Sequence, residues 1–436
     1  MSSFDTLGLA EPLLRALTAC GYSTPTPVQE RTIPPLLKGR DVLGCAQTGT
    51  GKTAAFSLPV LQHMAKSERR GGRRKVRALI LTPTRELAAQ IGESLTTYGK
   101  HLDFKHHVIF GGVGQNPQVR ALKAGLDILV ACPGRLLDLM GQGYIDLDHV
   151  EFFVLDEADR MLDMGFVHDV RRVLKVLPNK RQNLLFSATM PTSIVKLAGS
   201  FLVDPVLVEV TPEQKTVDRI DQTLMFVLKA DKKLLLGHLL KTRDVEQAMV
   251  FTRTKHGANR VVKQLDQQGI EAQAIHGNKS QNARTKTLNA FRSGALKVLI
   301  ATDVASRGID VDGVSHVFNY DLPNVPESYV HRIGRTGRAG RAGEAIAFCD
   351  LDEGLCLRDI ERLIGESIPV DTDHEWHATD AMPRNGVHRK PAKKPVQQGR
   401  GGRGGPPSNR PRQPRAEAAP AVTPAKRRRR RRPSAS

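Results

Sequence analysis

Residues 46–53 combine two glycines with a lysine and a threonine, in the order Ala-Gln-Thr-Gly-Thr-Gly-Lys-Thr. An apolar run precedes them and a helical pattern follows, and a loop in this context binds phosphate groups. Gly49 and Gly51 allow the backbone to wrap phosphates with its N–H groups, and the start of the next helix favours negative charge. We therefore expect Lys52 to reach the β- and γ-phosphates of a nucleotide and Thr53 to hold Mg²⁺. Alanine at the first position departs from the strict motif, which has glycine there.

Three carboxylates follow a second apolar run further along the chain. Phe152–Leu155 has the composition of a strand buried on both faces, and Asp156, Glu157 and Asp159 come directly after it. Ligands of open parallel sheets bind beyond the carboxyl ends of the strands, and a carboxylate cluster there suits the Mg²⁺ that a nucleotide carries. Alone, the pattern also fits a strand that runs into an acidic turn. Together with the loop at residues 46–53, it predicts a nucleoside triphosphatase site.

Two further segments carry groups that suit phosphate chemistry. Residues 187–189, Ser-Ala-Thr, follow another apolar run, where the same residue types also fit an ordinary helix cap. Residues 331–338 are His-Arg-Ile-Gly-Arg-Thr-Gly-Arg. Arginine side chains donate in a fixed fork that suits a γ-phosphate, although a solvated basic helix end would have a similar composition.

The elements that must position these groups alternate between apolar and amphipathic segments. Such alternation predicts parallel sheets covered by helices on both sides. Helical periodicity fills the gaps between strands, as at Arg85–Thr97 and Val167–Leu177, and Pro59 should kink the helix after the phosphate loop. The expected strands are Asp41–Cys45, Ala78–Thr82, His107–Phe110, Ile128–Ala131, Phe152–Leu155 and Asn183–Ser187, then Ala248–Phe251, Ala272–Ile275, Lys297–Ala301, His316–Asn319 and Glu344–Phe348.

The pattern divides the chain into two α/β domains and a tail. We expect the domains at residues 1–210 and 222–370, with a polar linker at 211–221 that contains Pro212. Only the first domain has a phosphate loop, which suggests a site shared across an interdomain cleft. Residues 371–436 are expected to form a disordered, basic tail rich in Arg, Gly and Pro, because nothing there could bury a core.

The charge of the chain is concentrated in this tail. Residues 384–436 hold 17 of the 65 Lys and Arg residues and a single acid, so they carry +16 of the formal net charge of +20. The five cysteines are scattered without metal-ligand spacing, which fits free thiols in a reducing cytosol. The first residues lack the features of a signal peptide, and no apolar run is long enough for a membrane span. We expect a cytoplasmic protein with no membrane contact.

The order and content of these motifs resemble the DEAD-box family of ATP-dependent RNA helicases, whose name residues 156–159 spell. The resemblance extends from residue 4 to about residue 370 and is strongest to the bacterial RhlE-like branch. It implies two RecA-like domains flanking a cleft for ATP and RNA. It also implies ATP and Mg²⁺ as cofactors and RNA, contacted through its backbone rather than its sequence, as partner.

The resemblance also implies roles for individual residues around the nucleotide. Gln29 would read the adenine edge, since its amide offers a donor and an acceptor in one plane, and Phe4 would stack on the ring. Glu157 would orient and deprotonate the attacking water. The implied catalytic residues are Lys52, Asp156, Glu157, His331, Arg335 and Arg338, and the last two would act as arginine fingers. The implied nucleotide contacts are Phe4, Gln29, Gln47, Thr48, Gly49, Thr50, Gly51, Lys52, Thr53 and Asp310. The implied metal ligands are Thr53 and Asp156, which would bind Mg²⁺ partly through water.

Other positions match the family's RNA-binding and coupling segments. Short loops with Gly, Thr and Arg suit contacts to phosphate and 2′-OH groups. Cys132 stands where the family usually has threonine, which puts one hydroxyl contact in doubt. The implied RNA contacts are Pro83, Thr84, Arg85, Gly112, Pro133, Gly134, Arg135, Arg253, Gly277, Gln281, Arg284 and Thr302, and the residues implied to couple the ATP state to RNA grip are Asp159, Ser187 and Thr189.

Taken together, these features predict an RNA-dependent ATPase that unwinds short RNA duplexes or remodels RNA–protein complexes, with ribosomal or RNA-decay complexes as candidate partners. One alternative is an RNA chaperone or clamp in which the basic tail dominates and ATP hydrolysis times release. Another is a DNA translocase, which shares the loop and the carboxylates. Phe4, Gln29 and Asp159 argue against the translocase.

Overall fold

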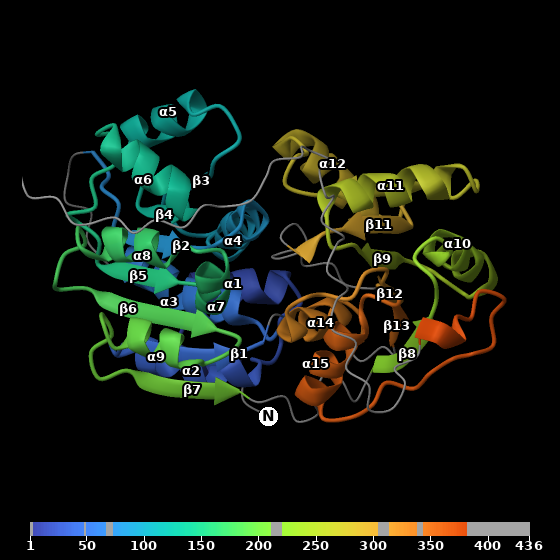
Figure 1. The fold of residues 1–436 in the computed structure, drawn as a ribbon. Helices are drawn as coiled ribbons and strands as arrows, with labels where there is room; N and C mark the ends of the chain where they lie inside the picture. Colours follow the sequence, from blue (N-terminus) through green and yellow to red (C-terminus); the bar gives the residue numbers. More distant parts are fainter. Residues whose placement is uncertain are drawn as a thin grey trace, which may run out of the picture. The chain divides into compact units, whose positions relative to one another are not determined.

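The computed structural model describes residues 3–47, 49–66, 73–210, 220–303, 314–337 and 343–381. Two parallel sheets run through this part of the chain, each covered by helices (Figure 1). The pairing between neighbouring strands is parallel throughout both sheets. The chain therefore has the two parallel-sheet α/β domains of RecA type that its sequence predicts.

The first sheet has seven strands in the order β3-β4-β2-β5-β6-β1-β7. Its central strands are four-residue apolar runs buried at every position, as expected for a sheet covered on both faces. Neighbouring strands align their carboxyl ends, for example Leu81 beside Leu155. The strands are β1 (Val42–Ala46), β2 (Ala78–Leu81), β3 (His106–Ile109), β4 (Ile128–Ala131), β5 (Phe152–Leu155), β6 (Gln182–Ser187) and β7 (Val206–Val210).

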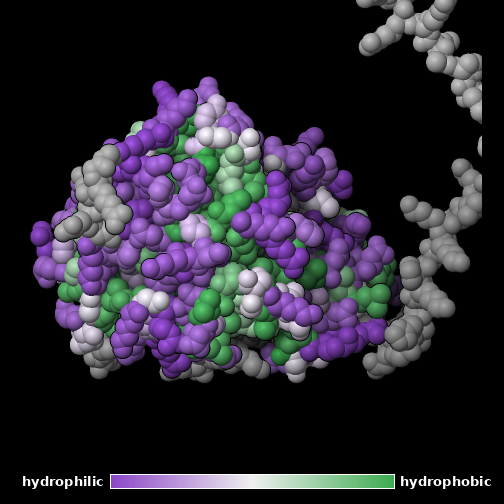
Figure 2. Space-filling model, turned by 90° about the vertical axis from the view of Figure 1, so that its left-hand side faces the viewer, coloured by the Kyte–Doolittle hydropathy of each residue, from purple (hydrophilic) through white to green (hydrophobic). Residues whose placement is uncertain are grey.

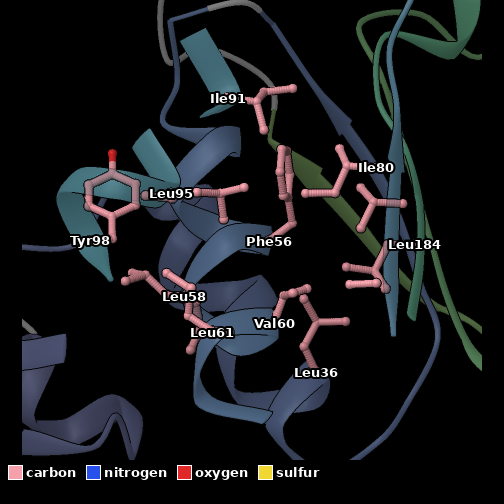
Figure 3. Packing of buried hydrophobic residues seen from close by; sticks show 14 of the residues in the cluster. Leu36, Phe56, Leu58, Val60, Leu61, Ile80, Ile91, Leu95, Tyr98 and Leu184 are labelled. Atoms are coloured by element: carbon pink, nitrogen blue, oxygen red, sulfur yellow. The ribbon is translucent and has the colours of Figure 1, made fainter. Parts of the chain in front are cut away.

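Helices cover both faces of this sheet and enclose two hydrophobic clusters. Because side chains alternate along a strand, Ile80 joins the cluster under α1–α4, while its neighbour Leu79 joins the cluster under α5–α9. Figure 3 shows part of the first cluster, in which Phe56 of α3 lies near Ile91 of α4 and Ile80 of β2, and Val60 of α3 lies beside Leu36 of α2. The helices are η1 (Phe4–Leu7), α1 (Glu11–Ala19), α2 (Pro27–Leu37), α3 (Lys52–Lys66), α4 (Arg85–Tyr98), α5 (Asn116–Ala124), α6 (Pro133–Gly141), α7 (Ala158–Asp163), α8 (Val167–Leu174) and α9 (Thr192–Ala198).

The second sheet has six strands in the order β10-β11-β9-β12-β13-β8, and its hydrophobic clusters lie on both faces in the same way. The strands are β8 (Ile220–Phe226), β9 (Ala248–Phe251), β10 (Ala272–Ile275), β11 (Val298–Ala301), β12 (His316–Asn319) and β13 (Gly343–Cys349). The helices are α10 (Lys232–Thr242), α11 (Lys255–Asp266), α12 (Gln281–Arg292), α14 (Pro326–Ile333), α15 (Gly354–Ile364) and η3 (Thr379–Ala381).

The second domain extends past both of its expected boundaries. Its edge strand β8 begins at Ile220, inside the segment expected to be linker, because all seven of its residues pair with β13. Beyond residue 370, the chain returns to the same edge, where Val227 pairs with His377. Trp376 packs against the hydrophobic cluster that includes Val250. Residues 371–378 therefore belong to the folded domain rather than to the tail, and residues 382–436 lie outside the described part.

The remaining differences from the sequence-based expectation are small. Strands β7 and β8 are absent from the expected set, and α8 ends at Leu174. The helix after the phosphate loop, α3, has Pro59 in its interior, as the sequence requires. Figure 2 shows a surface on which hydrophilic side chains predominate and hydrophobic ones gather in patches between them. Val203 and Leu207, which are 75% and 62% exposed, are among the large hydrophobic side chains at the surface. In the described ranges, no helix combines the length and apolar character needed to cross a membrane.

Candidate functional site

The predicted phosphate loop joins β1 to α3. Gly49 and Gly51 have φ angles of 86° and 92°, in the left-handed region that favours glycine. A Cβ atom on Gly51 would also lie 2.4 Å from Nε2 of Gln29 and 3.0 Å from Oγ1 of Thr26. The loop therefore requires glycine at position 51 for both its backbone conformation and its packing. Thr48 lies outside the described residues.

The other polar groups of the loop already bond within it. Lys52 is buried, and its Nζ donates to the carbonyl oxygen of Ala46 at 2.6 Å. The Thr50 hydroxyl donates to the carbonyl oxygen of Gln47 at 2.8 Å. Thr53 is half-buried in the first turn of α3. A lysine folded onto its own loop is a charged donor beside the helix N-terminus, where phosphate groups bind.

Gln29 connects the predicted base-recognition segment to the phosphate loop. Its Oε1 accepts from the backbone N–H of Thr26 at 3.0 Å, and its Nε2 donates to the carbonyl oxygen of Gly51 at 3.1 Å. The side chain is only 4% exposed. Phe4 is equally buried and belongs to the hydrophobic cluster under α1–α4. The structure thus places Gln29 against the loop and places the Phe4 ring within the core.

The carboxylates at the end of β5 are almost completely buried. Asp156, Glu157 and Asp159 are 2%, 4% and 8% exposed. Burial, reinforced by the negative charge of Glu157, raises the pKa of Asp156 to about 7, while nearby Lys52 opposes the rise. A buried carboxylate of this kind gains from a divalent cation, so the residues present fit Mg²⁺ carried by a nucleotide. The effect of Lys52 on this pKa indicates that the phosphate loop lies near the carboxylates.

Glu157 is held by a partner that sequence analysis did not identify. Nη1 of Arg160 donates to both carboxylate oxygens of Glu157, at 2.8 Å each, and both side chains are buried. The backbone of Glu157 has a φ of 52°, which is rare for a residue with a side chain. Rare backbone conformations persist where the surrounding structure fixes them, and they concentrate at functional sites. The three-residue spacing in α7 is the only sequence signal for this pair.

Asp159 joins the carboxylate segment to residues 187–189. Its Oδ2 accepts from the backbone N–H groups of Ala188 and Thr189, at 3.1 and 3.0 Å, and from the Thr189 hydroxyl at 3.1 Å. Its backbone N–H donates to Oγ of Ser187 at 3.2 Å. The serine and threonine therefore contact the carboxylate segment and do not cap α9, whose N-cap is Pro191. This contact brings together the three residues predicted to couple the two activities.

The predicted RNA contacts of the first domain lie after β2, β3 and β4, which are neighbours in the sheet. Thr84 caps α4 by accepting from the N–H of Leu87 at 3.3 Å, and Arg135 donates to the carbonyl oxygen of Val113 at 3.3 Å. Gly112 has a φ of 78°, and a Cβ atom there would collide with the guanidinium of Arg85. Pro83 is buried, Pro133 is the buried first residue of α6, and Gly134 is exposed.

The second domain repeats this arrangement after β9, β10 and β11, which are also neighbours. Arg253 follows β9, Gly277 is exposed after β10, and Thr302 is buried after β11. Gln281 and Arg284 lie in the first turn of α12. Because the carboxyl ends of parallel strands lie at the same end of a sheet, each domain gathers its predicted RNA contacts at the carboxyl-terminal end of its sheet.

Three of these side chains, Arg85, Gln281 and Arg284, form contacts between the two domains, and Glu86 joins them. The buried carboxylate of Glu86 accepts from Nε2 of Gln281 at 3.0 Å and pairs with Nη2 of Arg284 at 2.9 Å. Nη1 of Arg85 lies 3.4 Å from Oε1 of Gln281. Glu86 follows the predicted RNA contacts Pro83, Thr84 and Arg85 in the sequence but was not assigned a role of its own. Its pairing with Gln281, 195 residues away, and with Arg284 appears only in the structure.

The arginine-rich segment at residues 331–338, which begins in α14 and continues past its end, divides into structural and candidate catalytic residues. Arg332 is 1% exposed and donates to Asp303, Asn319 and the carbonyl oxygen of Asp321, so it holds the domain together. Arg335 is also buried, and its Nε donates to the carbonyl oxygen of His331 at 3.2 Å. His331 is half-buried. The predicted second arginine finger, Arg338, and the predicted ribose contact, Asp310, lie outside the described residues.

Comparison with known proteins identifies the family. Residues 26–197 match the DEAD/DEAH box helicase model, and residues 231–340 match the helicase conserved C-terminal domain. The ATP-dependent RNA helicase CshA of Limosilactobacillus reuteri is 43% identical over 360 residues, which cover 83% of this chain and 71% of that protein. The chain belongs to the DEAD-box family of ATP-dependent RNA helicases.

Other DEAD-box relatives agree with this assignment. CshA of Listeria monocytogenes is 44% identical over 363 residues, which cover 83% of this chain and 68% of that protein. Among solved structures, Saccharomyces cerevisiae Dbp5 bound to RNA and ADP BeF3 superposes with a TM-score of 0.76 at 35% identity, covering 85% of this chain and 96% of that one. Mss116p bound to ssRNA and AMP-PNP gives 0.77 at 28% identity, covering 85% and 79%. As a DEAD-box helicase, the chain is an RNA-dependent ATPase.

Proposed function

We propose that this helicase hydrolyses ATP to separate short RNA duplexes or to remodel RNA–protein complexes. The observation that supports it most is that the buried Lys52 of the phosphate loop lies close enough to the buried Asp156, next to Glu157, to lower the pKa of that carboxylate. Phosphoryl transfer needs mainly positioning and charge neutralisation, and this site supplies a cationic donor, a phosphate-binding backbone and a base. Family membership favours this function over an RNA clamp or a DNA translocase. The RhlE-like branch stays a prediction, because the relatives named above are CshA proteins.

We assign the nucleotide roles as follows. The N–H groups of the loop at Gly49 and Gly51 bind phosphates, and Lys52 exchanges the Ala46 carbonyl for the β- and γ-phosphates. Gln29 contacts the adenine edge. Thr53 and Asp156 would hold Mg²⁺, which neutralises phosphate charge when bound. Glu157 orients the attacking water and accepts its proton. The arginine fingers Arg335 and Arg338, with His331, would stabilise the γ-phosphate.

The sheet-edge loops of both domains are proposed to grip the RNA backbone. Contacts to phosphates and 2′-OH groups carry no base sequence, so the grip should be sequence-independent. Asp159, through Ser187 and Thr189, would transmit the state of the nucleotide to this grip. We further propose that the helicase acts in the cytoplasm, a reducing compartment that suits its five free cysteines. Ribosomal or RNA-decay complexes are its proposed targets there. Crosslinking the protein to RNA in cells, followed by sequencing, tests the targets.

The catalytic assignment is tested by replacing the base. Glu157→Gln should retain ATP binding and nearly abolish phosphate release, and the variant should stay bound to RNA with ATP, because the water loses its proton acceptor. Lys52→Ala should instead weaken ATP binding itself. The measurements are RNA-stimulated phosphate release and nucleotide affinity for both variants. Wild-type hydrolysis by Glu157→Gln in the presence of RNA would show that another residue is the base.

A further inference from the structure

A cluster of buried charges lies beside the predicted RNA-binding edge of the second domain. The Glu353 cluster consists of Lys232, Arg253, Asp321, Asp350 and Glu353. The side chains of Lys232 and Glu353 are 1% and 2% exposed, whereas that of Arg253 is 36% exposed. Ionised groups are rarely buried so completely unless they are paired, so the contacts inside the cluster must fix its geometry.

Glu353 is the centre of the cluster. Its Oε2 accepts from Nζ of Lys232 at 2.6 Å and from the backbone N–H of Asp350 at 3.2 Å. Its Oε1 accepts from Nη2 of Arg253 at 2.6 Å and from the backbone N–H of Leu322 at 3.0 Å. Four donors therefore fix both oxygens of one carboxylate, which leaves the side chain a single orientation.

Lys232 secures this carboxylate from the interior. Its Nζ also lies 3.2 Å from Asp350 and 3.9 Å from Asp321. Burial alone would lower the pKa of Lys232, but the surrounding carboxylates outweigh it and raise the pKa, so the amine stays charged. A charged lysine at the first position of α10 thus holds Oε2 of Glu353, while Arg253 bonds to Oε1.

Arg253 is the member of the cluster that reaches the surface. Its backbone N–H donates to Oδ2 of Asp321 at 2.9 Å. Besides Glu353, its guanidinium contacts the carbonyl oxygen of Leu322, from Nη2 at 2.9 Å and from Nε at 3.3 Å. These bonds use Nε and Nη2 and hold the plane of the guanidinium fixed. A side chain ordered before binding does not lose that freedom when it meets a ligand.

We propose that Glu353, secured by Lys232, is a positioning residue that fixes the Arg253 guanidinium for a phosphate of bound RNA. This inference rests on the proposed function, in which Arg253 contacts RNA. It assigns the binding strength of Arg253 to a carboxylate that is 100 residues away in sequence and nearly inaccessible to RNA itself. The competing explanation is that the cluster only stabilises the domain by joining α10 and α15 to the loops after β9 and β12.

Glu353→Gln separates the two explanations because charge and geometry predict opposite results. Removing a negative charge beside an RNA site should tighten RNA binding if electrostatic attraction alone acts. Loss of the positioning contact should instead raise the RNA KM of the ATPase, by about threefold to tenfold, the range for the net contribution of one ordinary hydrogen bond, while kcat at saturating RNA changes far less. Asp359→Asn, which removes a charge from the exposed face of α15, is the matched control and should not weaken RNA binding.

A double-mutant cycle tests whether Glu353 acts through Arg253. Arg253→Ala should raise the RNA KM and reduce the slope of log affinity against log salt by about 0.7, the value for one phosphate of a single strand. Adding Glu353→Gln to Arg253→Ala should then raise KM no further. If Glu353→Gln alone does not fold, Lys232→Gln/Glu353→Gln removes both buried charges together and is expected to raise KM in the same way.

The outcomes distinguish this inference from the function on which it rests. A wild-type KM for Arg253→Ala would show that Arg253 is no RNA contact, and it would overturn both. A raised KM for Arg253→Ala with an unchanged or lower KM for the Glu353 variants would overturn the positioning role alone. A lower melting temperature with unchanged salt slope and KM would assign the cluster to stability only.

Discussion

A single atom at position 51 would disturb two parts of the nucleotide site together. The φ of 92° excludes most side chains, and the missing Cβ leaves space for the amide of Gln29, whose Nε2 donates to the carbonyl oxygen of Gly51. The residue expected to recognise the base therefore also braces the loop that binds phosphate. At position 51, backbone geometry and packing, rather than charge, determine which substitutions are tolerated.

Gly51→Ala should therefore raise the KM for ATP by at least about tenfold, since a non-glycine residue in the left-handed region costs roughly 1–2 kcal/mol before any collision with Gln29 is counted. Gly141→Ala is the matched control, because a Cβ at that helical position meets nothing within 4 Å and φ is not positive. ATP titrations of the RNA-stimulated ATPase measure both. Equal KM values for the two variants would show that the loop tolerates a side chain at position 51.

At the scale of elements, sequence patterning located the buried strands and the edge strands β3 and β10, but it missed the edge strands β7 and β8. Phe152–Leu155 and Ala248–Phe251 were expected with the bounds that the structure has, because continuous apolar runs mark strands covered on both faces. β7 and β8 are partly exposed edge strands with weaker patterns. Residues paired through space were also missed: Arg160 touches Glu157 within one turn, but Glu353 meets Lys232 across 121 residues.

The segment after α15 gives an element-scale prediction. A chain ending at residue 381 should melt like the full-length protein, whereas a chain ending at residue 370 should melt at a lower temperature. The shorter chain loses Trp376 from the hydrophobic cluster and its pairing with β8. Trp376→Ala in the longer chain should cost about 1–3 kcal/mol, below the value for a fully buried tryptophan. Circular dichroism melting compares the three, and identical curves would show that residues 371–381 add no stability.

The start of β5 gives a prediction for pH. Glu151 pairs with His63 of α3 and with Arg77 before β2, and these contacts, His63 first, lower the pKa of Glu151 to about 2. A lowered carboxylate pKa stabilises the fold above the unfolded value of about 4.3. That contribution disappears as the pH falls towards about 2. The side chain is 44% exposed, so solvent screening makes the effect modest.

Urea unfolding of the wild type and of Glu151→Gln should therefore differ at pH 7 and converge as the pH approaches about 2. Glu93→Gln, which changes an exposed acid of α4, controls for loss of charge alone and should show no such convergence. A difference between wild type and Glu151→Gln that stays constant with pH would mean that the ion pairs at the start of β5 do not stabilise the domain.

At the scale of the whole molecule, most of the net positive charge is carried by a part of the sequence that follows the described site residues. Residues 384–436 carry +16, whereas every described site residue precedes them. Cations that bind RNA phosphates do so mainly by counterion release. If about six to ten of them engage, affinity should fall roughly 10³–10⁵-fold between 50 and 200 mM salt.

Deleting residues 384–436 should raise the RNA KM and flatten its salt dependence, while ATP turnover at saturating RNA stays close to that of the full-length protein. ATPase rates measured against RNA concentration at two salt levels, for both chains, provide the test. Superimposable curves would show that this segment does not bind the RNA substrate. A collapse of the saturated rate would show that it takes part in hydrolysis.

The parallel pairing of both sheets has a consequence for how this chain can change. Most of the site residues described for each sheet follow the carboxyl ends of its strands; Phe4 and Gln29, which precede β1, and Arg335, which precedes β13, are the exceptions. Amino-end loops that carry no described site residue, such as the exposed turn at Gln142 and Gly143 between α6 and β5, are therefore open to insertion and drift. New binding modules, fluorophores or affinity tags should be accommodated in these loops. Evolution or protein engineering can therefore add new binding properties to this helicase without changing its catalytic mechanism.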